Sequence, residues 1–321
     1  CSFQFVPQMY GRRGICWNAS QIPIVLKEKI RSKVAVTFHE FAWNPSLNPT
    51  DILRSWIMKF QMRNLINGCD LAITTCPRYV QLLKKWVPTK IPMEFIPVGA
   101  SIEPVKMSDA EKKIFFKQYG LETAKVFGVF GRLSSFRNYP TAVRVLKRAR
   151  ESGINAVLML IGGMRSSNPP LFRKLMQLAR SLSVDQNVIE TGELTEPWVS
   201  KHLQLVDLFL FPQSDGVSTR NTTVMAALAH GLPIAAYEPV SGNFDEYKIP
   251  YGVFTPRVNE ESFIQAAVAW VTKSNNSMNG RETNIQYFQT HFSWRLIGEK
   301  YIKAVQAAGG REATVKTEVL V

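Results

Sequence analysis

The sequence has few cysteines and no long apolar run. Its four cysteines, at positions 1, 16, 69 and 76, show no CxxC spacing, which excludes a small disulfide framework and favours reduced thiols in a cytosolic setting. No apolar stretch approaches the ~18–20 residues that cross a bilayer, and no signal peptide opens the chain. The best candidate, residues 224–237, is interrupted by His230, Gly231 and Pro233. Because the chain also lacks an initiator Met and begins within an apolar stretch, we expect its natural N-terminus to lie further upstream.

Motifs of several function classes are also missing. No GxGxxG follows a predicted strand, which weighs against a Rossmann oxidoreductase. No recognised motif interleaves Lys and Arg with aromatic residues on one surface, so we expect no nucleic-acid partner. The chain has neither a DxD motif nor a cluster of histidines, and we therefore expect no metal and no cofactor.

What is present is a globular composition with an uneven basic charge. The 321 residues are 45% hydrophobic and 20% charged, which excludes a disordered or collagen-like chain and suggests about two domains. Residues 1–100 carry 13 Lys and Arg against 5 Asp and Glu, a net +8 out of the total of +14. Such a field attracts nucleic acid, anionic lipid or phosphorylated substrates; a solvated basic surface is the alternative.

Short apolar runs rich in β-formers alternate with helical patterns, which indicates a parallel α/β architecture. The predicted strands cover residues 33–38, 70–75, 93–97, 125–130, 156–161, 188–190, 208–211 and 233–236. The predicted helices cover residues 51–66, 78–86, 108–119, 170–182, 197–205, 222–229, 263–271 and 294–307. One more helix carries apolar residues at i, i+3, i+4 and i+7, namely Ala142, Val145, Leu146 and Ala149.

Two consecutive open α/β series therefore share the chain. We expect a first domain over residues 1–105, a connection over 106–125, a second domain over 126–290, and a C-terminal helix and tail over 291–321. In open parallel sheets, ligands bind at the carboxyl ends of the strands, where loops lead into helix N-termini. The polar residues of those loops are the candidate site residues.

The first candidate loop follows the strand that ends near Gly131. Arg132 and Arg137 lie five residues apart in it, just before a helix. Guanidinium forks match phosphate oxygens, and a helix N-terminus adds N–H groups and its dipole. Two arginines that merely solvate a loop are the alternative, and the Gly-Arg pair alone favours it.

The second candidate loop, residues 211–223, runs from a strand through a series of hydroxyl side chains into an Ala-rich helix that ends at Gly231. Asn221 and Thr222 suit the N-cap of this helix. The candidate ligands of a pyrophosphate and its sugar are Asp215, Ser218, Arg220, Asn221, Thr222 and Thr223. Ordinary capping explains one or two of these residues but not the whole cluster.

A third loop contains paired glycines, Gly162 and Gly163, after another buried strand. Paired glycines allow close approach of a ligand or of neighbouring backbone. A plain tight turn explains them equally well.

In this order and spacing, the motifs resemble the glycosyl transferases group one, enzymes of the GT-B fold that use nucleotide sugars. The resemblance covers residues 3–294 and is strongest over 126–236. It rests on Gly131-Arg132-Leu133 with Arg137, Ile161-Gly162-Gly163, Thr191-Gly192-Glu193-Leu194, Asp207 at a strand entrance, and the segment from Met225 to Pro233. It implies two Rossmann-like domains, of which the first, on the acceptor side, is truncated and lacks its first strands and the Gly-rich loop beside the donor.

The resemblance also implies residue roles. Arg132 and Arg137, the latter a Lys in most relatives, would neutralise the distal phosphate of the donor, and the helix that begins near residues 221–223 would receive the diphosphate. Thr37-Phe38-His39 resembles the segment whose histidine lies near the transferred sugar, so His39 is the catalytic candidate. A lone histidine is otherwise more often a structural residue.

Residues 3–14 resemble the acceptor-side loop of a subgroup of the family. The resemblance places Gln4, Tyr10, Gly11 and Gly14 on the acceptor side. Arg12 and Arg13 would meet a phosphate or a membrane surface, although solvent exposure accounts for them equally well.

The chain departs from the family at the donor site. The family has two glutamates eight positions apart; aligned on Gly231 and Pro233, the second falls at Ala226, and the first is replaced by Asp215 or Ser218. The usual ribose and sugar contacts therefore do not carry over. A variant subgroup with a Ser-x-Arg loop is favoured.

We therefore expect an enzyme that moves a sugar from a nucleoside-diphosphate sugar to a saccharide or lipid-linked acceptor, without a metal, in polysaccharide biosynthesis; the resemblance implies retention of configuration. The alternative is a catalytically degenerate homologue that only binds nucleotide sugar. Basic segments at residues 27–33 and 84–86 suit attachment to anionic lipid. We accordingly expect a cytoplasmic protein, peripheral on the inner face of the membrane, with solvated helix faces as the alternative.

Overall fold

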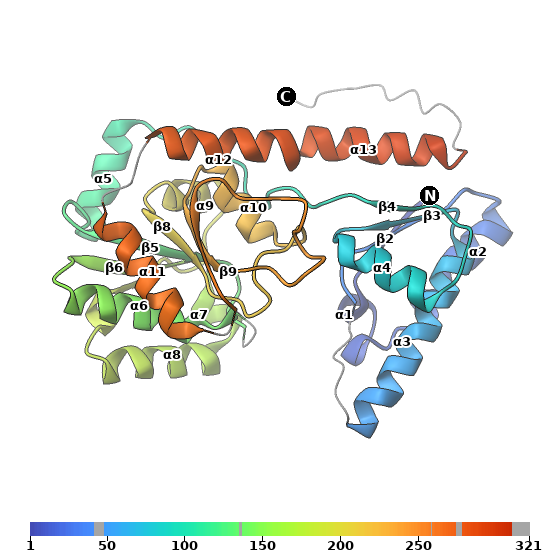
Figure 1. Ribbon diagram of the computed structural model, residues 1–321, viewed down its shortest axis with the longest axis horizontal. Helices are drawn as coiled ribbons and strands as arrows, with labels where there is room; N and C mark the ends of the chain where they lie inside the picture. The colour runs from blue at the N-terminus through green and yellow to red at the C-terminus, as the bar shows by residue number, and fades with distance from the viewer. Residues whose placement is uncertain (42–47, 135–136, 258, 274–277, 310–321) are drawn as a thin grey trace. The chain divides into compact units, whose positions relative to one another are not determined.

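A computed structural model describes residues 1–41, 48–134, 137–257, 259–273 and 278–309. Internal contacts divide the chain into two compact units (Figure 1). The first unit comprises Cys1–Pro97 and the chain from Arg295 onward; the second comprises Val98–Trp294. Each is built on a parallel sheet covered by helices, which confirms the predicted α/β class with two sheets. The predicted domain boundaries stay predictions.

The first unit has a four-stranded sheet in the order β1-β2-β3-β4, with every neighbouring pair parallel. Its strands are β1 (Ser2–Phe5), β2 (Ala35–Phe38), β3 (Leu71–Thr74) and β4 (Met93–Phe95). Its helices are α1 (Pro7–Tyr10), the 3-10 helix η1 (Arg12–Gly14), α2 (Trp17–Ile30), α3 (Pro49–Gly68), α4 (Pro77–Trp86) and α13 (Trp294–Ala307). Residues 2–5, which the resemblance assigned to a loop, form the strand β1.

Apolar side chains on the two faces of this sheet decide where the helices pack. One face packs against α2, α3 and α4, with Phe5 and Phe38 fully buried. The opposite face packs against α13, whose Ile297 contacts the cluster of Ala35 and Ile73. Both faces of the sheet are therefore covered, as the near-continuous apolar runs of a parallel sheet require.

The second unit has a six-stranded parallel sheet in the order β10-β9-β8-β5-β6-β7. Its strands are β5 (Lys125–Phe130), β6 (Ala156–Ile161), β7 (Val188–Glu190), β8 (Leu208–Phe211), β9 (Ile234–Tyr237) and β10 (Gly252–Thr255). Counted along the chain from β5, this is the doubly wound order 3-2-1-4-5-6. The order reverses between β5 and β8, which pair directly through Phe127 with Leu208 and Gly128 with Phe209.

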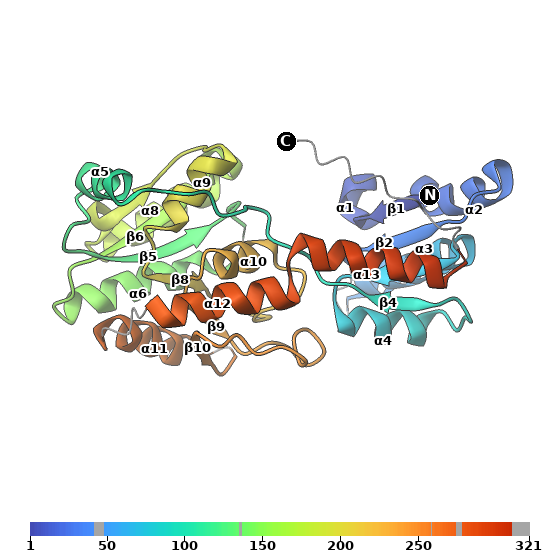
Figure 2. The ribbon, with the colours of Figure 1, turned by 90° about the horizontal axis from the view of Figure 1, so that it is seen from above.

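Helices cover both faces of the second sheet (Figure 2). One face carries α5 (Asp109–Tyr119), α9 (Glu196–Leu203), α10 (Thr222–Ala229) and α12 (Met278–His291). The other carries α6 (Tyr139–Glu151), α8 (Pro169–Ser181) and α11 (Glu260–Thr272), while α7 (Met164–Ser167) and η3 (Asp185–Asn187) lie in the connections. Helices α6 and α11 lie side by side in both views and are joined by ion pairs, Arg144 with Glu260 at 2.8 Å and Arg148 with Glu261 at 3.0 Å.

Within the part of the chain that the structure describes, no helix has the length and apolar character to cross a membrane. The four cysteines, all described, are free thiols. Burial raises the pKa of Cys16 to about 11 and that of Cys69 to about 12, so both stay protonated and unreactive near neutral pH.

Candidate functional site

The reversal of strand order in the second unit places two of the predicted loops on either side of one crevice. The loop after β5 leads to α6 on one face of the sheet, and the loop after β8 leads to α10 on the other. A crevice of only about 10 Å³, smaller than a diphosphate, is lined by Val129, Phe130, Arg137 and Tyr139 on one side and by residues 209–213 on the other. This is where doubly wound sheets bind their ligands.

Arg137 and the start of α10 meet at Gly131. Gly131 has a φ of +110°, and a Cβ there would lie 2.6 Å from Arg137 Nη1 and 3.2 Å from Thr223 Cγ2. Arg137 Nη1 also donates to the carbonyl oxygen of Phe130, at 3.0 Å. The guanidinium and the second residue of α10 therefore come from separate loops to the same edge of the sheet.

The backbone around Arg132 is held on both sides, while its side chain is exposed. Its carbonyl oxygen accepts from the hydroxyl of Tyr139 at 3.1 Å, and the next N–H, of Leu133, donates to Ser167 Oγ at 3.0 Å. Burial raises the pKa of Tyr139, against the opposing effect of the Arg137 charge. Tyr139 therefore stays a neutral donor that fixes the arginine loop.

The N-terminus of α10 is shaped by Asn221, which occupies the predicted N-cap position. Its side chain does not cap the helix; instead, Oδ1 accepts from the N–H of Ser218 at 2.6 Å. Thr222 is exposed at the first helical position and Thr223 is buried at the second, so the positive end of the helix dipole lies at the same edge as Arg137.

The remaining residues of the loop after β8 are divided between its surface and its interior. Asp215 is exposed and Arg220 is half-buried, with Asp215 Oδ2 3.9 Å from Arg220 Nη2. Ser218 and Thr219 are buried within the loop, and the N–H of Thr219 donates to the carbonyl oxygen of Asn243 at 3.3 Å. Ser218 and Thr223 are thus buried candidates, while Asp215 and Thr222 are exposed and Arg220 and Asn221 are half-buried.

The paired glycines form a tight turn that the protein's own backbone approaches. Gly162 and Gly163 have φ values of +82° and +33°, and a Cβ on Gly163 would lie 2.8 Å from Glu193 Cγ. The N–H of Gly162 donates to Thr191 Oγ1 at 3.0 Å, and that of Gly163 to the carbonyl oxygen of Gly192 at 2.6 Å. Gly162 and Gly163 therefore leave space for residues 191–193, the segment that follows β7.

Tyr139 and Gln213 also line the crevice, although neither belongs to the predicted site residues. Gln213 could have been found because it lies two residues beyond β8, within the loop at a carboxyl end. Tyr139 gave no such signal, since its role comes from a contact with Arg132 across seven residues.

In the first unit, the catalytic candidate His39 and two acceptor-side candidates, Gln4 and Tyr10, form one cluster at the carboxyl end of β1 and β2. His39 Nε2 lies 2.7 Å from Gln4 Oε1, and the hydroxyl of Tyr10 donates to the carbonyl oxygen of Gln4 at 2.8 Å. Because the Gln4 amide donates to Ser2 Oγ and Thr37 Oγ1, its oxygen faces His39, whose Nε2 carries the proton. Burial lowers the pKa of His39 in spite of the Glu40 charge, so the ring is neutral at pH 7 and Nδ1 is its basic nitrogen.

Gly11 and Gly14 shape the turn around η1. A Cβ on Gly11 would overlap the carbonyl oxygen of Ile15, and Gly14 has a φ of +80°. The carbonyl oxygen of Gly14 accepts from Gln61 Nε2 at 3.3 Å. Both glycines thus hold the loop that carries Tyr10.

Two other histidines have structural roles. His230 Nε2 lies 2.7 Å from Ser200 Oγ, and its Nδ1 donates to the carbonyl oxygen of Ala226 at 2.7 Å. His202 bonds Tyr119 and the carbonyl oxygen of Trp198 in the same manner. His39 is therefore the described histidine that lies in a cluster of predicted site residues.

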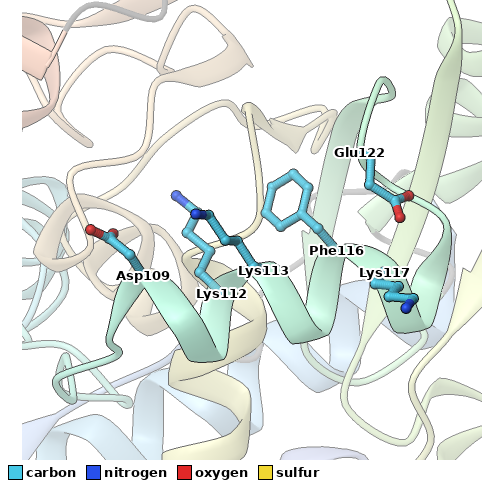
Figure 3. A pocket seen from close by; sticks show the side chains of 6 residues that line it. All are labelled: Asp109, Lys112, Lys113, Phe116, Lys117 and Glu122. Carbon is cyan, nitrogen blue, oxygen red and sulfur yellow. The ribbon is translucent and has the colours of Figure 1, made fainter.

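A larger hollow of about 580 Å³ lies along α5 (Figure 3). It is lined by Asp109, Lys112, Lys113, Phe116, Lys117 and Glu122, and it contains none of the residues that the motifs singled out. Burial and the Arg281 charge lower the pKa of Lys112. Among the described residues no group of three His, Cys, Asp or Glu side chains could hold a metal ion.

The structure is similar to solved glycosyltransferases. Anabaena Alr3699/HepE in complex with UDP superimposes with a TM-score of 0.73 at 14% identity, over 90% of this chain and 76% of that one. Sucrose-phosphate synthase from Thermosynechococcus elongatus gives 0.70 at 18%, over 91% and 72%. WaaG, a glycosyltransferase involved in lipopolysaccharide biosynthesis, gives 0.60 at 16%, over 96% and 98%. At such low sequence identity, the structural similarity shows the fold alone. Together with the two parallel sheets, it confirms the predicted GT-B fold.

The sequence itself matches a family model. No curated protein matches it, but the model of the glycosyl transferases group 1 matches residues 111–286, which is more than half of the chain and includes the whole crevice between β5 and β8. The chain is therefore a glycosyltransferase and belongs to the glycosyl transferases group 1.

Proposed function

We propose that this chain transfers a sugar from a nucleoside-diphosphate sugar, and that its second unit holds the diphosphate at the edge between β5 and β8. The observation that carries the proposal is the meeting of Arg137 and Thr223 at Gly131. An arginine and a helix N-terminus at one edge of a doubly wound sheet suit an anionic ligand. The solved structures of Alr3699/HepE with UDP and with UDP-glucose support the choice of ligand.

In this proposal, Arg137, Arg132 and the N-terminus of α10 stabilise the leaving group. When the glycosidic bond breaks, negative charge develops on the departing diphosphate. Arg137 and the exposed Arg132 supply two guanidinium groups, and the first turn of α10 adds N–H groups and the positive end of its dipole. We accordingly propose that charge on the leaving group is offset by the protein without a metal ion.

The acceptor side of the proposal rests on His39. Its neutral ring lies at the carboxyl end of β2, with Nε2 on Gln4 and Nδ1 left as a basic nitrogen. A neutral imidazole in this state can accept a hydrogen bond from a sugar hydroxyl. We propose a saccharide or lipid-linked acceptor, with retention of anomeric configuration, in a cytoplasmic location.

A nucleotide-sugar-binding protein without turnover is the second candidate. It is favoured by Ala226, which stands where the family has a glutamate and is fully buried within α10. Ser218, one of two replacements for the other glutamate, is also buried. Such a chain would bind donor and release no nucleoside diphosphate.

Release of nucleoside diphosphate from a panel of nucleotide sugars, with and without acceptor saccharides, tests the proposal. Arg137→Ala is expected to lower kcat/KM for the donor by about 10- to 100-fold, because a charge-assisted hydrogen bond to phosphate is lost. The matched control is Arg173→Ala, an exposed arginine on α8. Binding without release in the wild type would favour the second candidate, and equal loss in both variants would contradict the role of Arg137.

A further inference from the structure

The outer face of α2 and α3 in the first unit carries large apolar side chains in solvent. On α3, Leu53 is 64% exposed and Trp56 is 72% exposed. Phe60 follows one turn later, and its ring stacks on Trp17 of α2, with centroids 5.0 Å apart and an interplanar angle of 1°. Together with Ile52, these residues form what we call the α2–α3 face: Trp17, Ile52, Leu53, Trp56 and Phe60.

The spacing along α3 puts these side chains on one side of the helix. Ile52, Trp56 and Phe60 are four residues apart, and Leu53 precedes Trp56 by three, so they form one stripe. The opposite side of the helix is used for folding, since Met58 and Met62 are buried in the core of the unit. The exposed side chains of the stripe are therefore not needed for the hydrophobic core of the first unit.

Positive charge accompanies the stripe. Lys59 and Arg63 are both exposed. Lys59 immediately precedes Phe60, and Arg63 follows Phe60 by about one helical turn. The sole acidic residue of α3 is Asp51, 3.4 Å from Arg54, so the helix carries a net charge of +2, three cations less one anion. Residues 1–100 as a whole carry +8. Exposed aromatic and aliphatic residues beside cations are the composition of helices that lie in a lipid interface.

We propose that the α2–α3 face docks on an anionic lipid surface. Trp17, Trp56 and Phe60 would enter the boundary between headgroups and acyl chains, as aromatic side chains do at membrane interfaces. Lys59 and Arg63 would lie at the level of the lipid phosphates. Since α3 contains charged residues along its length, it lies on the membrane rather than across it. The inference does not depend on the proposed sugar transfer.

Co-sedimentation of the full chain with vesicles tests the docking surface. The probes are vesicles of phosphatidylcholine with phosphatidylglycerol and vesicles of phosphatidylcholine alone. Leu53→Ser with Trp56→Ser is expected to weaken binding to the anionic vesicles by about tenfold or more, because two apolar anchors are lost. The matched control is Ile114→Ser with Trp198→Ser, which removes an equally exposed aliphatic residue and an exposed tryptophan from the second unit.

A double charge-reversal variant separates the electrostatic contribution to vesicle binding from the apolar one. Lys59→Glu with Arg63→Glu is expected to weaken binding to anionic vesicles by about fivefold per removed charge or more. Its control is Lys113→Glu with Lys117→Glu, an exposed pair with the same spacing on α5. Added salt should lower binding of the wild type in parallel.

Three results would overturn the inference. The first is no binding of the wild-type chain to either kind of vesicle. The second is equal binding by the face variants and their controls. The third is concentration-dependent self-association in analytical ultracentrifugation that only the face variants abolish, which would assign the face to a second copy of the chain. Circular dichroism spectra and the midpoint of urea unfolding serve as folding controls, since neither readout requires lipid or nucleotide.

Discussion

At the scale of single residues, the proposed donor site between β5 and β8 depends on the absence of a side chain at Gly131. A side chain there would displace the Arg137 guanidinium and crowd Thr223, and the φ of +110° lies where L-residues are strained. Arg137 is held in turn by the carbonyl oxygen of Phe130. The absence of a Cβ at Gly131 therefore allows the Arg137 guanidinium to take its observed position.

Gly131→Ala tests this arrangement. We expect a loss of about 1–3 kcal/mol in the free energy of unfolding, because the backbone conformation is unfavourable for alanine. We also expect the KM for donor to rise by about tenfold, since the guanidinium must move from its position. Steady-state kinetics and urea unfolding measure the two effects.

Gly153→Ala is the control for strain alone. Gly153 has a φ of +77°, and among the described residues no atom lies within 4 Å of its missing Cβ. It should lose a comparable amount of stability with an unchanged KM. If Gly131→Ala also left the KM unchanged, the link between Gly131 and the donor would be wrong.

At the scale of elements, α10 is fastened to α9 by a buried histidine. His230, at the C-cap of α10, accepts a hydrogen bond from Ser200 of α9, and Ser200 Oγ in turn accepts from the N–H of Val105 at 2.9 Å. Burial lowers the pKa of His230 from 6.5 to about 4. The position of the helix that would face the diphosphate thus depends on a neutral imidazole.

The lowered pKa predicts a pH dependence of stability. The unfolded chain takes up the His230 proton near pH 6.5 and the folded chain only near pH 4, so protons favour unfolding between these values. The stabilisation is fully present above pH 6.5 and is lost as the pH falls toward 4, with about 2 kcal/mol of it lost between pH 7 and pH 5. His230→Asn should remove this part of the dependence in urea unfolding at the two pH values.

His291→Asn leaves the Ser200–His230 network intact and should retain the wild-type loss between pH 7 and pH 5. An unchanged pH dependence in His230→Asn would show that His230 is not the group responsible.

Several elements were predictable because burial on both faces leaves a clear pattern. The strands at residues 125–130, 156–161, 188–190 and 208–211 and the helices at 222–229 and 294–307 have the predicted bounds. The pattern fails elsewhere for physical reasons. Helix α2 contains Pro23, and β1 is an edge strand of four residues with alternate positions exposed; α12 was missed because polar residues interrupt its apolar spacing.

The site was predictable where it follows from topology and not where it follows from loop conformation. The meeting of Arg137 with Thr223 comes from two adjacent carboxyl ends in a parallel sheet. By contrast, Asn221 turns back to Ser218 instead of capping α10, and Glu193 occupies the space beside Gly163. Both depend on contacts between loops, which no spacing in the sequence encodes.

At the scale of the whole molecule, the chain consists of two units with different surfaces. The second unit has its own sheet, its own cores on both faces and the arginines of the proposed donor site. The first unit carries most of the basic excess and the α2–α3 face. Donor binding and lipid binding are therefore expected to be separable properties of one chain.

Hydrogen exchange followed by mass spectrometry, with and without UDP, tests the central claim most directly. We expect UDP to slow amide exchange in residues 131–134 and 137–138 and in the first turn of α10, at residues 222–225, because a diphosphate at this edge accepts from those N–H groups. Exchange along α5, beside the larger hollow, should not change. Protection of residues 109–122 with none at residues 222–225 would contradict the account and move the nucleotide to α5.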